Sequence, residues 1–329
     1  MNTTARSLAV LMAASMTLGT GMSAMAASTE YPVTITTYNQ DGTELETTYE
    51  KAPEKVVAVY QGCIETMLAL GLEDHLVAAA GLDNEVPEEQ AEAFAKVNYL
   101  DEFTPSLETV TMLEPDMIFS WGSYFGESTL GAAADWVDKG VNTYISSNTK
   151  SDGSNRTLEN EYQDILNMGI IFDVQDQAEA IVDEMKGTIE SVLEQTASVE
   201  EKPEVMVIEF LGENITNYGS TSLGGDMVQQ LGGVLVNEEY TTIGQEDIIA
   251  ANPDVIFIVY MPYSGDDPET VMNDNMNKLL ENEVYQSLDA VQNGTVYPIM
   301  LSEMYASATR TQDGIETFAK GMYPELTLE

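Results

Sequence analysis

Two segments of this chain repeat one another, and this repeat limits the possible folds more than any other feature. Residues 108–119 read ETVTMLEPDMIF, residues 246–257 read EDIIAANPDVIF, and the two align without a gap. In each copy a glutamate opens a short helical stretch, and an apolar strand follows. A Pro-Asp pair ends the helix, because the proline ring disfavours helical backbone geometry at the residue before it. Recurrence in both halves of a 329-residue chain favours two lobes of like topology.

Short apolar strands alternate with helical stretches on both sides of the middle of the chain. Such alternation is typical of parallel sheets that are covered by helices on both faces. After a hairpin at 33–49, we expect strands at 55–60, 76–80, 117–121, 205–211, 233–236, 255–260 and 295–300, and helices at 64–70, 86–95, 223–231, 272–280 and 309–322.

One longer helix separates the two halves. Residues 176–199 carry apolar side chains at helical spacing, and at ~1.5 Å of rise per residue this helix is long enough to join two lobes. The expected fold is therefore α/β, with two lobes of parallel-sheet topology, one long connecting helix and a ligand cleft between the lobes. We place the N-terminal lobe at 27–174, the connecting helix at 175–200 and the C-terminal lobe at 201–329.

The first 26 residues have the pattern of a secretory signal peptide. Arg6 supplies a positive charge, residues 8–16 form an apolar run, and Ala24-Met25-Ala26 gives the small-x-small cleavage pattern. No later apolar run approaches the ~18 residues of a membrane span, so we expect no membrane insertion after cleavage. Cys63, the single cysteine, lies far beyond this segment, so no lipid anchor is evident. We therefore expect an exported protein, periplasmic or extracellular.

The balance of charge excludes some partners. Lys and Arg number 12 against 56 Asp and Glu, which gives a formal net charge of -44. A surface this acidic repels phosphate backbones and anionic lipid headgroups, so nucleic acid is not an expected partner. The simplest interpretation of the excess of acidic residues is a well-solvated surface that resists aggregation.

The order and spacing of several short motifs resemble those of the Fe/B12-type periplasmic binding proteins. The motifs are APEKVVA at 52–58, ET to LGL at 65–72, SLE to EPD at 106–116, the helix start at 156–161, Glu246 leading to NPD at 252–254, and RTQDGIE at 310–316. The resemblance implies a monomeric solute-binding component of an ABC importer, which captures an iron chelate between its lobes. It also implies that Glu108 and Glu246, one on each lobe, meet arginines of the permease dimer.

The loops that follow the expected strands are rich in aromatic side chains. An open α/β sheet binds ligands at the carboxyl ends of its strands, and a large apolar ligand needs wide aromatic area there. The candidate ligand contacts are Tyr60, Trp121, Tyr124, Tyr218, Tyr260, Tyr263 and Tyr305, with Phe125, Met261 and Met304 beside them. Arg156 and Arg310 could grip a chelate oxygen, or each could instead be tied to carboxylates of its own lobe.

Other functions are weighed against this one. A haem or a cobalamin-type corrinoid could use the same architecture, with a tyrosine such as Tyr60 on haem iron. His75 is the single histidine and is expected in an exposed turn, which argues against a directly bound metal ion and against a hydrolase. Cys63 begins a helix, where a thiol pKa can fall, but lacks a base. A carboxylate-pair glycosidase and a surface adhesin are the remaining alternatives, and we expect neither an enzyme nor a resident cofactor.

Overall fold

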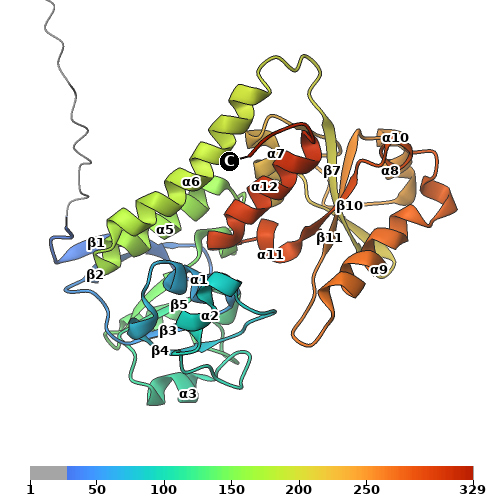
Figure 1. Cartoon of the computed structure of the whole chain (residues 1–329). Helices are drawn as coiled ribbons and strands as arrows, with labels where there is room; N and C mark the ends of the chain where they lie inside the picture. The colour runs from blue at the N-terminus through green and yellow to red at the C-terminus, as the bar shows by residue number, and fades with distance from the viewer. Residues whose placement is uncertain (1–27, 329) are drawn as a thin grey trace, which may run out of the picture.

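A computed structural model describes residues 28–328, in which two lobes are joined by a long helix (Figure 1). The expected signal peptide, residues 1–26, lies outside the described residues. Helix α6 (Gln175–Gln195) runs from the lobe that holds β1 to β6 toward the lobe that holds β7 to β12. It packs beside α5 (Leu158–Phe172) at one end and α12 (Thr311–Met322) at the other.

The N-terminal lobe is built on a four-stranded parallel sheet in the order β4-β3-β5-β6. Its strands are β3 (Val56–Val59), β4 (Leu76–Ala80), β5 (Met117–Ser120) and β6 (Asn142–Ile145). Helices α1 (Gln61–Ala69), α2 (Ala91–Phe94), α3 (Leu107–Met112) and α4 (Ala133–Val137) connect or cover the strands. The hairpin of β1 (Val33–Tyr38) and β2 (Glu44–Tyr49) forms a separate antiparallel sheet, as the sequence predicted.

The C-terminal lobe has a mixed sheet in the order β10-β8-β7-β11-β12, with β9 also paired to β7. The parallel strands are β7 (Glu204–Leu211), β9 (Val234–Leu235), β11 (Val255–Tyr260) and β12 (Val296–Met300). The antiparallel strands β8 (Asn214–Asn217) and β10 (Thr242–Ile243) were not expected. The helices are α7 (Leu223–Gln230), α8 (Gln245–Ala251), α9 (Pro268–Leu280), α10 (Asp289–Asn293) and α11 (Leu301–Met304).

The sequence repeat corresponds to one structural device that is used in both lobes. Helix α3 leads to β5, and α8 leads to β11, through a residue with left-handed backbone before the proline: Glu114 (φ 49°) and Asn252 (φ 42°). The aspartate after each proline then accepts a backbone N–H at the start of the neighbouring strand segment. Asp116 accepts from Lys55 at 2.9 Å, and Asp254 accepts from Glu204 at 2.9 Å. The predicted likeness of the two lobes is confirmed at this level of detail.

A shared apolar core joins the lobes along α5 and α6. Residues of the N-terminal sheet, of these two helices and of the C-terminal lobe belong to one continuous cluster, while the outer face of each sheet has its own smaller cluster. Helix α6 ends at Gln195, five residues before the expected boundary at 200. At this end the Thr196 hydroxyl donates to the Val192 carbonyl oxygen at 2.8 Å. Helix α6 contributes Ala178, Val182, Met185 and Val192 to this core and so packs against both lobes.

Two interpretations of single residues are corrected by the structure. His75 is half-buried rather than exposed: its Nδ1 lies 2.7 Å from the Pro53 carbonyl oxygen and its ring meets Phe172 edge to face. Cys63 is fully buried in α1, and burial raises the pKa of its thiol, so the possibility of a lowered pKa is wrong. Desolvation of the thiolate outweighs the helix terminus because the side chain faces the core.

Candidate functional site

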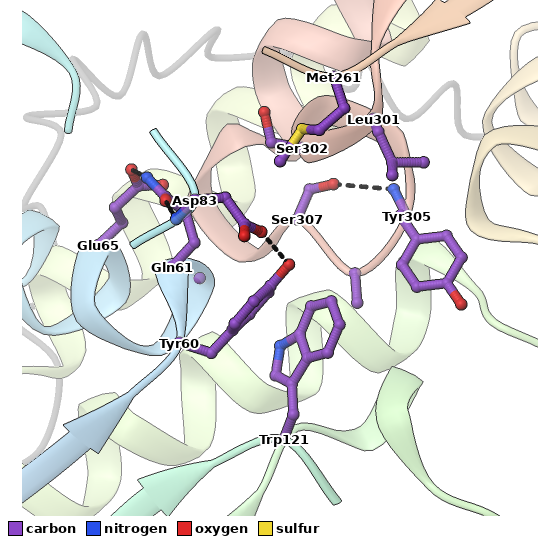
Figure 2. A pocket seen from close by; sticks show the side chains of 12 residues that line it. Tyr60, Gln61, Glu65, Asp83, Trp121, Met261, Leu301, Ser302, Tyr305 and Ser307 are labelled. Atoms are coloured by element: carbon purple, nitrogen blue, oxygen red, sulfur yellow. Dashed lines mark hydrogen bonds between the residues drawn. The ribbon is translucent and has the colours of Figure 1, made fainter. Parts of the chain in front are cut away.

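A cavity of about 80 Å³ lies where the two lobes meet, and its lining comes from both (Figure 2). The carboxyl ends of the N-terminal strands and the start of α1 form one wall, and the segment around α11 forms the other. No lysine or arginine lines the cavity. The lining residues are Tyr60, Gln61, Gly62, Glu65, Asp83, Trp121, Met261, Leu301, Ser302, Tyr305, Ala306 and Ser307.

Tyr60 occupies an unusual backbone position at the end of β3. Its φ is 88°, a value that bulky residues rarely adopt, and its N–H donates to the Ala80 carbonyl oxygen at 2.8 Å. Gly81 makes this possible, because a Cβ added there would lie 2.9 Å from the Phe103 carbonyl oxygen and 3.2 Å from the Tyr60 nitrogen. The fold thus fixes the phenol at the cavity wall, as strained residues at binding sites often are.

The Tyr60 hydroxyl donates a hydrogen bond to Asp83, a residue that the sequence analysis did not single out (Figure 2). Burial, reinforced by the neighbouring Asp83 carboxylate, raises the pKa of Tyr60 well above its ordinary value. The Asp83 side chain follows β4 and is only 8% exposed. Its backbone N–H donates to Gln61 at 3.0 Å, and its carbonyl oxygen accepts from Ser264 of the other lobe at 2.7 Å.

A continuous run of aromatic rings crosses the boundary between the lobes. The Tyr60 ring centroid is 3.9 Å from that of Trp121 and 5.5 Å from that of Tyr124. Trp121 in turn lies 6.0 Å from Tyr305 of the C-terminal lobe, and Tyr305 lies 6.4 Å from Tyr218. The Tyr60–Trp121 pair is closer than usual and the other three distances are ordinary for interacting rings, so the cluster presents wide apolar and π surface.

The guanidinium of Arg156 caps this run of rings. It lies 3.6 Å from the Tyr305 ring centroid, a cation–π contact, and donates to the Tyr305 carbonyl oxygen at 3.4 Å. Tyr218 is buried and donates to Glu209 at 2.6 Å. It follows the antiparallel strand β8 and not β7, so its expected position one strand earlier is corrected.

Arg310 forms a buried ion pair that bridges the lobes. Its Nε and Nη2 donate to the two carboxylate oxygens of Glu65 at 2.8 and 2.5 Å, and Nη2 also donates to the Glu85 carbonyl oxygen at 2.8 Å. Glu65 is fully buried in α1, and Arg310 is 9% exposed. The arginine's fork is thus occupied by a carboxylate of the opposite lobe, an arrangement that neither alternative for Arg310 foresaw.

The remaining candidates lie around this centre. Tyr263 lines an adjacent cavity of about 270 Å³ together with Asn84 and Arg310, whereas Tyr260 lines neither cavity. Glu108 and Glu246 are exposed in the first turns of α3 and α8, away from the cavity lining. Sequence reasoning missed Asp83, Gln61 and Ser302. The position of Asp83 directly after a parallel strand was the signal that could have identified it.

The described residues lack both a membrane-spanning helix and a cluster of metal-ligating side chains. Between residues 28 and 328, no helix is long and apolar enough to cross a membrane. Within the same range, no cluster of three or more histidine, cysteine, aspartate or glutamate side chains could hold a metal ion.

Comparison with known proteins shows which proteins this chain is similar to. Residues 56–300 match the family model described as periplasmic binding protein. A periplasmic binding protein from Veillonella parvula DSM 2008 superposes with a TM-score of 0.83 at 32% identity, covering 91% of this chain and 93% of that one. No curated protein matches significantly.

Two more distant structures share the fold. An ABC-type Fe3+-hydroxamate transport protein from Saccharomonospora viridis DSM 43017 has a TM-score of 0.68 at 20% identity, covering 89% of this chain and 100% of that one. A periplasmic heme-binding protein from Roseiflexus sp. RS-1 has a TM-score of 0.61 at 16% identity, covering 82% and 98%.

Proposed function

Because the chain belongs to the periplasmic binding protein family, we propose that it is the solute-binding component of an ABC importer that captures an iron chelate. The aromatic cavity enclosed by both lobes is the observation that carries this proposal. A chelate presents apolar ligand arms with few polar handles, which suits ring faces supplemented by a small number of fixed polar groups. The cavity of about 80 Å³ has room for one arm of a chelate. A pocket that holds a whole ligand of that kind needs ~300 Å³ or more.

The other proposed contacts lie beside the residues that line this cavity. Arg156, stacked on Tyr305, is placed to meet a chelate oxygen, and Tyr263 with its adjacent cavity extends the aromatic surface. Tyr124 and Tyr218 support the central rings. Arg310 contributes through its ion pair with Glu65, which holds the two walls together, and not as a free ligand contact.

Binding without chemical change is the expected activity. Hydrolysis needs an activated nucleophile with an adjacent base, but Cys63 is buried in the core and the His75 ring packs on Phe172, and neither residue lines the cavity. The acidic side chains of the lining, Glu65 and Asp83, are bonded to Arg310 and Tyr60 respectively. These partners argue against a carboxylate pair that acts on a glycosidic bond.

A haem ligated by Tyr60 is a weaker alternative. Iron binds tyrosine as the tyrosinate, and both burial and the Asp83 carboxylate raise the pKa of the Tyr60 phenol. A corrinoid needs no such ligation and would use the same ring surface. Both compounds therefore belong in the ligand panel that tests the proposal.

For the partner, we propose that an ABC permease dimer docks on the faces that carry Glu108 and Glu246. Both glutamates are exposed at helix starts, one on each lobe, and both helices belong to the repeated unit. We further propose that the protein is exported and acts as a monomer. The expected signal peptide and the family together support export.

Tryptophan fluorescence tests the binding function directly, because the chain has only two tryptophans. Trp121 lines the cavity, whereas Trp136 is buried in α4 with its Nε1 bonded to Leu130. Titration with ferric hydroxamates, a ferric catecholate, haem and cobinamide should quench the emission of the wild type and of Trp136→Phe, but not that of Trp121→Phe. The bound ligand should be recovered unchanged by mass spectrometry. The proposal fails if no member of the panel alters fluorescence or melting temperature, or if the ligand is chemically converted.

A further inference from the structure

The charge of the Asp83 side chain has no cationic partner. The carboxylate is 8% exposed and accepts one hydrogen bond, from the neutral Tyr60 hydroxyl. None of the ion pairs formed by residues 28–328 includes Asp83. The nearby Arg310 is already matched by Glu65 in a bidentate pair. Burial raises the pKa of Asp83, which is the cost of holding a carboxylate there without a cation, and the hydrogen bond from Tyr60 opposes this. Buried charges in proteins are nearly always paired, so a cation placed beside Asp83 would stabilise the ionised carboxylate.

The rings around Asp83 have the same preference. Figure 2 shows the carboxylate at the hydroxyl end of Tyr60, with Trp121 below that ring and Tyr305 across the cavity. The faces of aromatic rings carry negative potential and attract cations, most strongly when water is excluded. Trp121 also has a buried Nε1–H without a hydrogen-bond partner within the described part of the chain, and so offers a donor to an uncharged oxygen.

From these observations we propose that the cavity receives a cationic substituent, of the protonated-amine type, on a chelate that is neutral or positively charged overall. The inference rests on the proposed function and specifies the ligand class. The cavity volume of about 80 Å³ fits a substituent rather than a whole chelate. The formal net charge of -44 acts in the same direction, since it favours the approach of cations and disfavours anions.

A matched ligand series tests the charge of this substituent alone. A linear ferric trihydroxamate with a terminal amine is compared with its acetylated (uncharged) and succinylated (anionic) forms, and with a ferric triscatecholate as a multiply negative ligand. The wild type should bind the amine form about tenfold or more tightly than the acetylated form, because acetylation removes the positive charge and leaves only a neutral N–H donor for the carboxylate. The succinylated form and the triscatecholate should bind more weakly still.

Asp83→Asn identifies the source of the preference. Asparagine keeps an oxygen that can accept the Tyr60 hydroxyl but removes the charge, so the amine form should lose about tenfold in affinity while the acetylated form is unchanged. Asp135→Asn, which neutralises an exposed carboxylate on α4 of the same lobe, should alter neither affinity.

The outcomes separate the inference from the function. Equal binding of the three hydroxamates, or preference for the succinylated form or the triscatecholate, overturns the cationic subsite and leaves chelate binding intact. An unchanged preference in Asp83→Asn overturns the role of that carboxylate. If none of the four ferric chelates binds, the inference fails, and the proposed function fails as well unless haem or cobinamide binds.

Discussion

The ion pair of Arg310 with Glu65 joins residues that are 245 positions apart and belong to different lobes. Replacing Arg310 by Ala leaves the fully buried Glu65 charge without its partner, and breaking such a pair costs about 3–5 kcal/mol. We expect a loss of this size in the free energy of unfolding, measured with urea at pH 7. The double variant Arg310→Met with Glu65→Met should recover part of it, because the Glu65 charge is then removed together with its partner. Equal losses in both variants would show that packing and not charge dominates.

Glu303 should make stability depend on pH. Burial, with the repulsion of Asp313 second, raises the pKa of Glu303 from 4.5 to about 7, although Arg310 opposes this. A raised carboxyl pKa means that its contribution to stability is complete below pH 4.5 and is lost as the pH rises through 7. Glu303→Gln stays neutral. The wild type should therefore lose about 2 kcal/mol more than the variant between pH 4.5 and 8, after allowance for solvent screening.

Urea unfolding at several pH values gives the comparison for Glu303. Glu92→Gln, the same substitution at an exposed carboxylate on α2, serves as the control. A difference between Glu303→Gln and wild type that stays constant with pH would contradict the assignment.

At the scale of single residues, the sequence indicated where the aromatic rings lie but not which charged side chains pair with one another. Tyr60, Trp121 and Tyr305 could be placed near one site because each lies at the carboxyl end of an expected strand or in the loop after it. Asp83 is one of 56 acidic residues, and its position shortly after an expected strand is the one local feature that sets it apart. The pairing of Arg310 with Glu65 depends on how the lobes approach one another, which no local pattern encodes.

Elements of the repeat were predictable because their signals are local. A proline after a short helical stretch and an apolar run after Pro-Asp are signals within a few residues of sequence. They predict the helix-to-strand units α3-β5 and α8-β11 without reference to the rest of the chain. Strands β8 and β10 were missed for the opposite reason. They have four and two residues, and β10 is defined mainly by its pairing with β8, so tertiary contacts decide their conformation.

Helix α6 offers a test at a single position. Gly187 lies in the interior of α6 and is exposed, and an added Cβ would meet nothing within 4 Å. Gly187→Ala should therefore raise the free energy of unfolding by about 1 kcal/mol, because alanine loses less backbone entropy in a helix. Ligand affinity should not change. Gly169→Ala is the contrasting variant: its Cβ would lie 2.6 Å from that of Ala178, so it should destabilise the α5–α6 contact. A neutral or destabilising Gly187→Ala would contradict the continuous helix.

At the scale of the whole molecule, the repeat gives two similar faces that a dimeric partner could contact together. Glu108 and Glu246 start corresponding helices on separate lobes, and exposed apolar side chains accompany them: Met112, 78% exposed on α3, and Ile249, 39% exposed on α8. Within a helix, residues three or four apart share a face. Each lobe thus presents a carboxylate beside an apolar contact, which suits an interface that pairs arginines with apolar surface.

Replacing both glutamates should separate ligand binding from delivery. The double variant Glu108→Ala with Glu246→Ala should bind its chelate with affinity within about threefold of wild type, since neither residue lines the cavity, yet support little uptake by the cognate permease. The matched control is Glu92→Ala with Glu283→Ala, which removes one exposed carboxylate from each lobe outside the repeated helices and changes net charge equally. If the control loses as much uptake as the docking variant, delivery depends on overall charge and not on these two positions. If the docking variant loses chelate binding in parallel with uptake, the two glutamates support the fold or the site, and the permease contacts another surface.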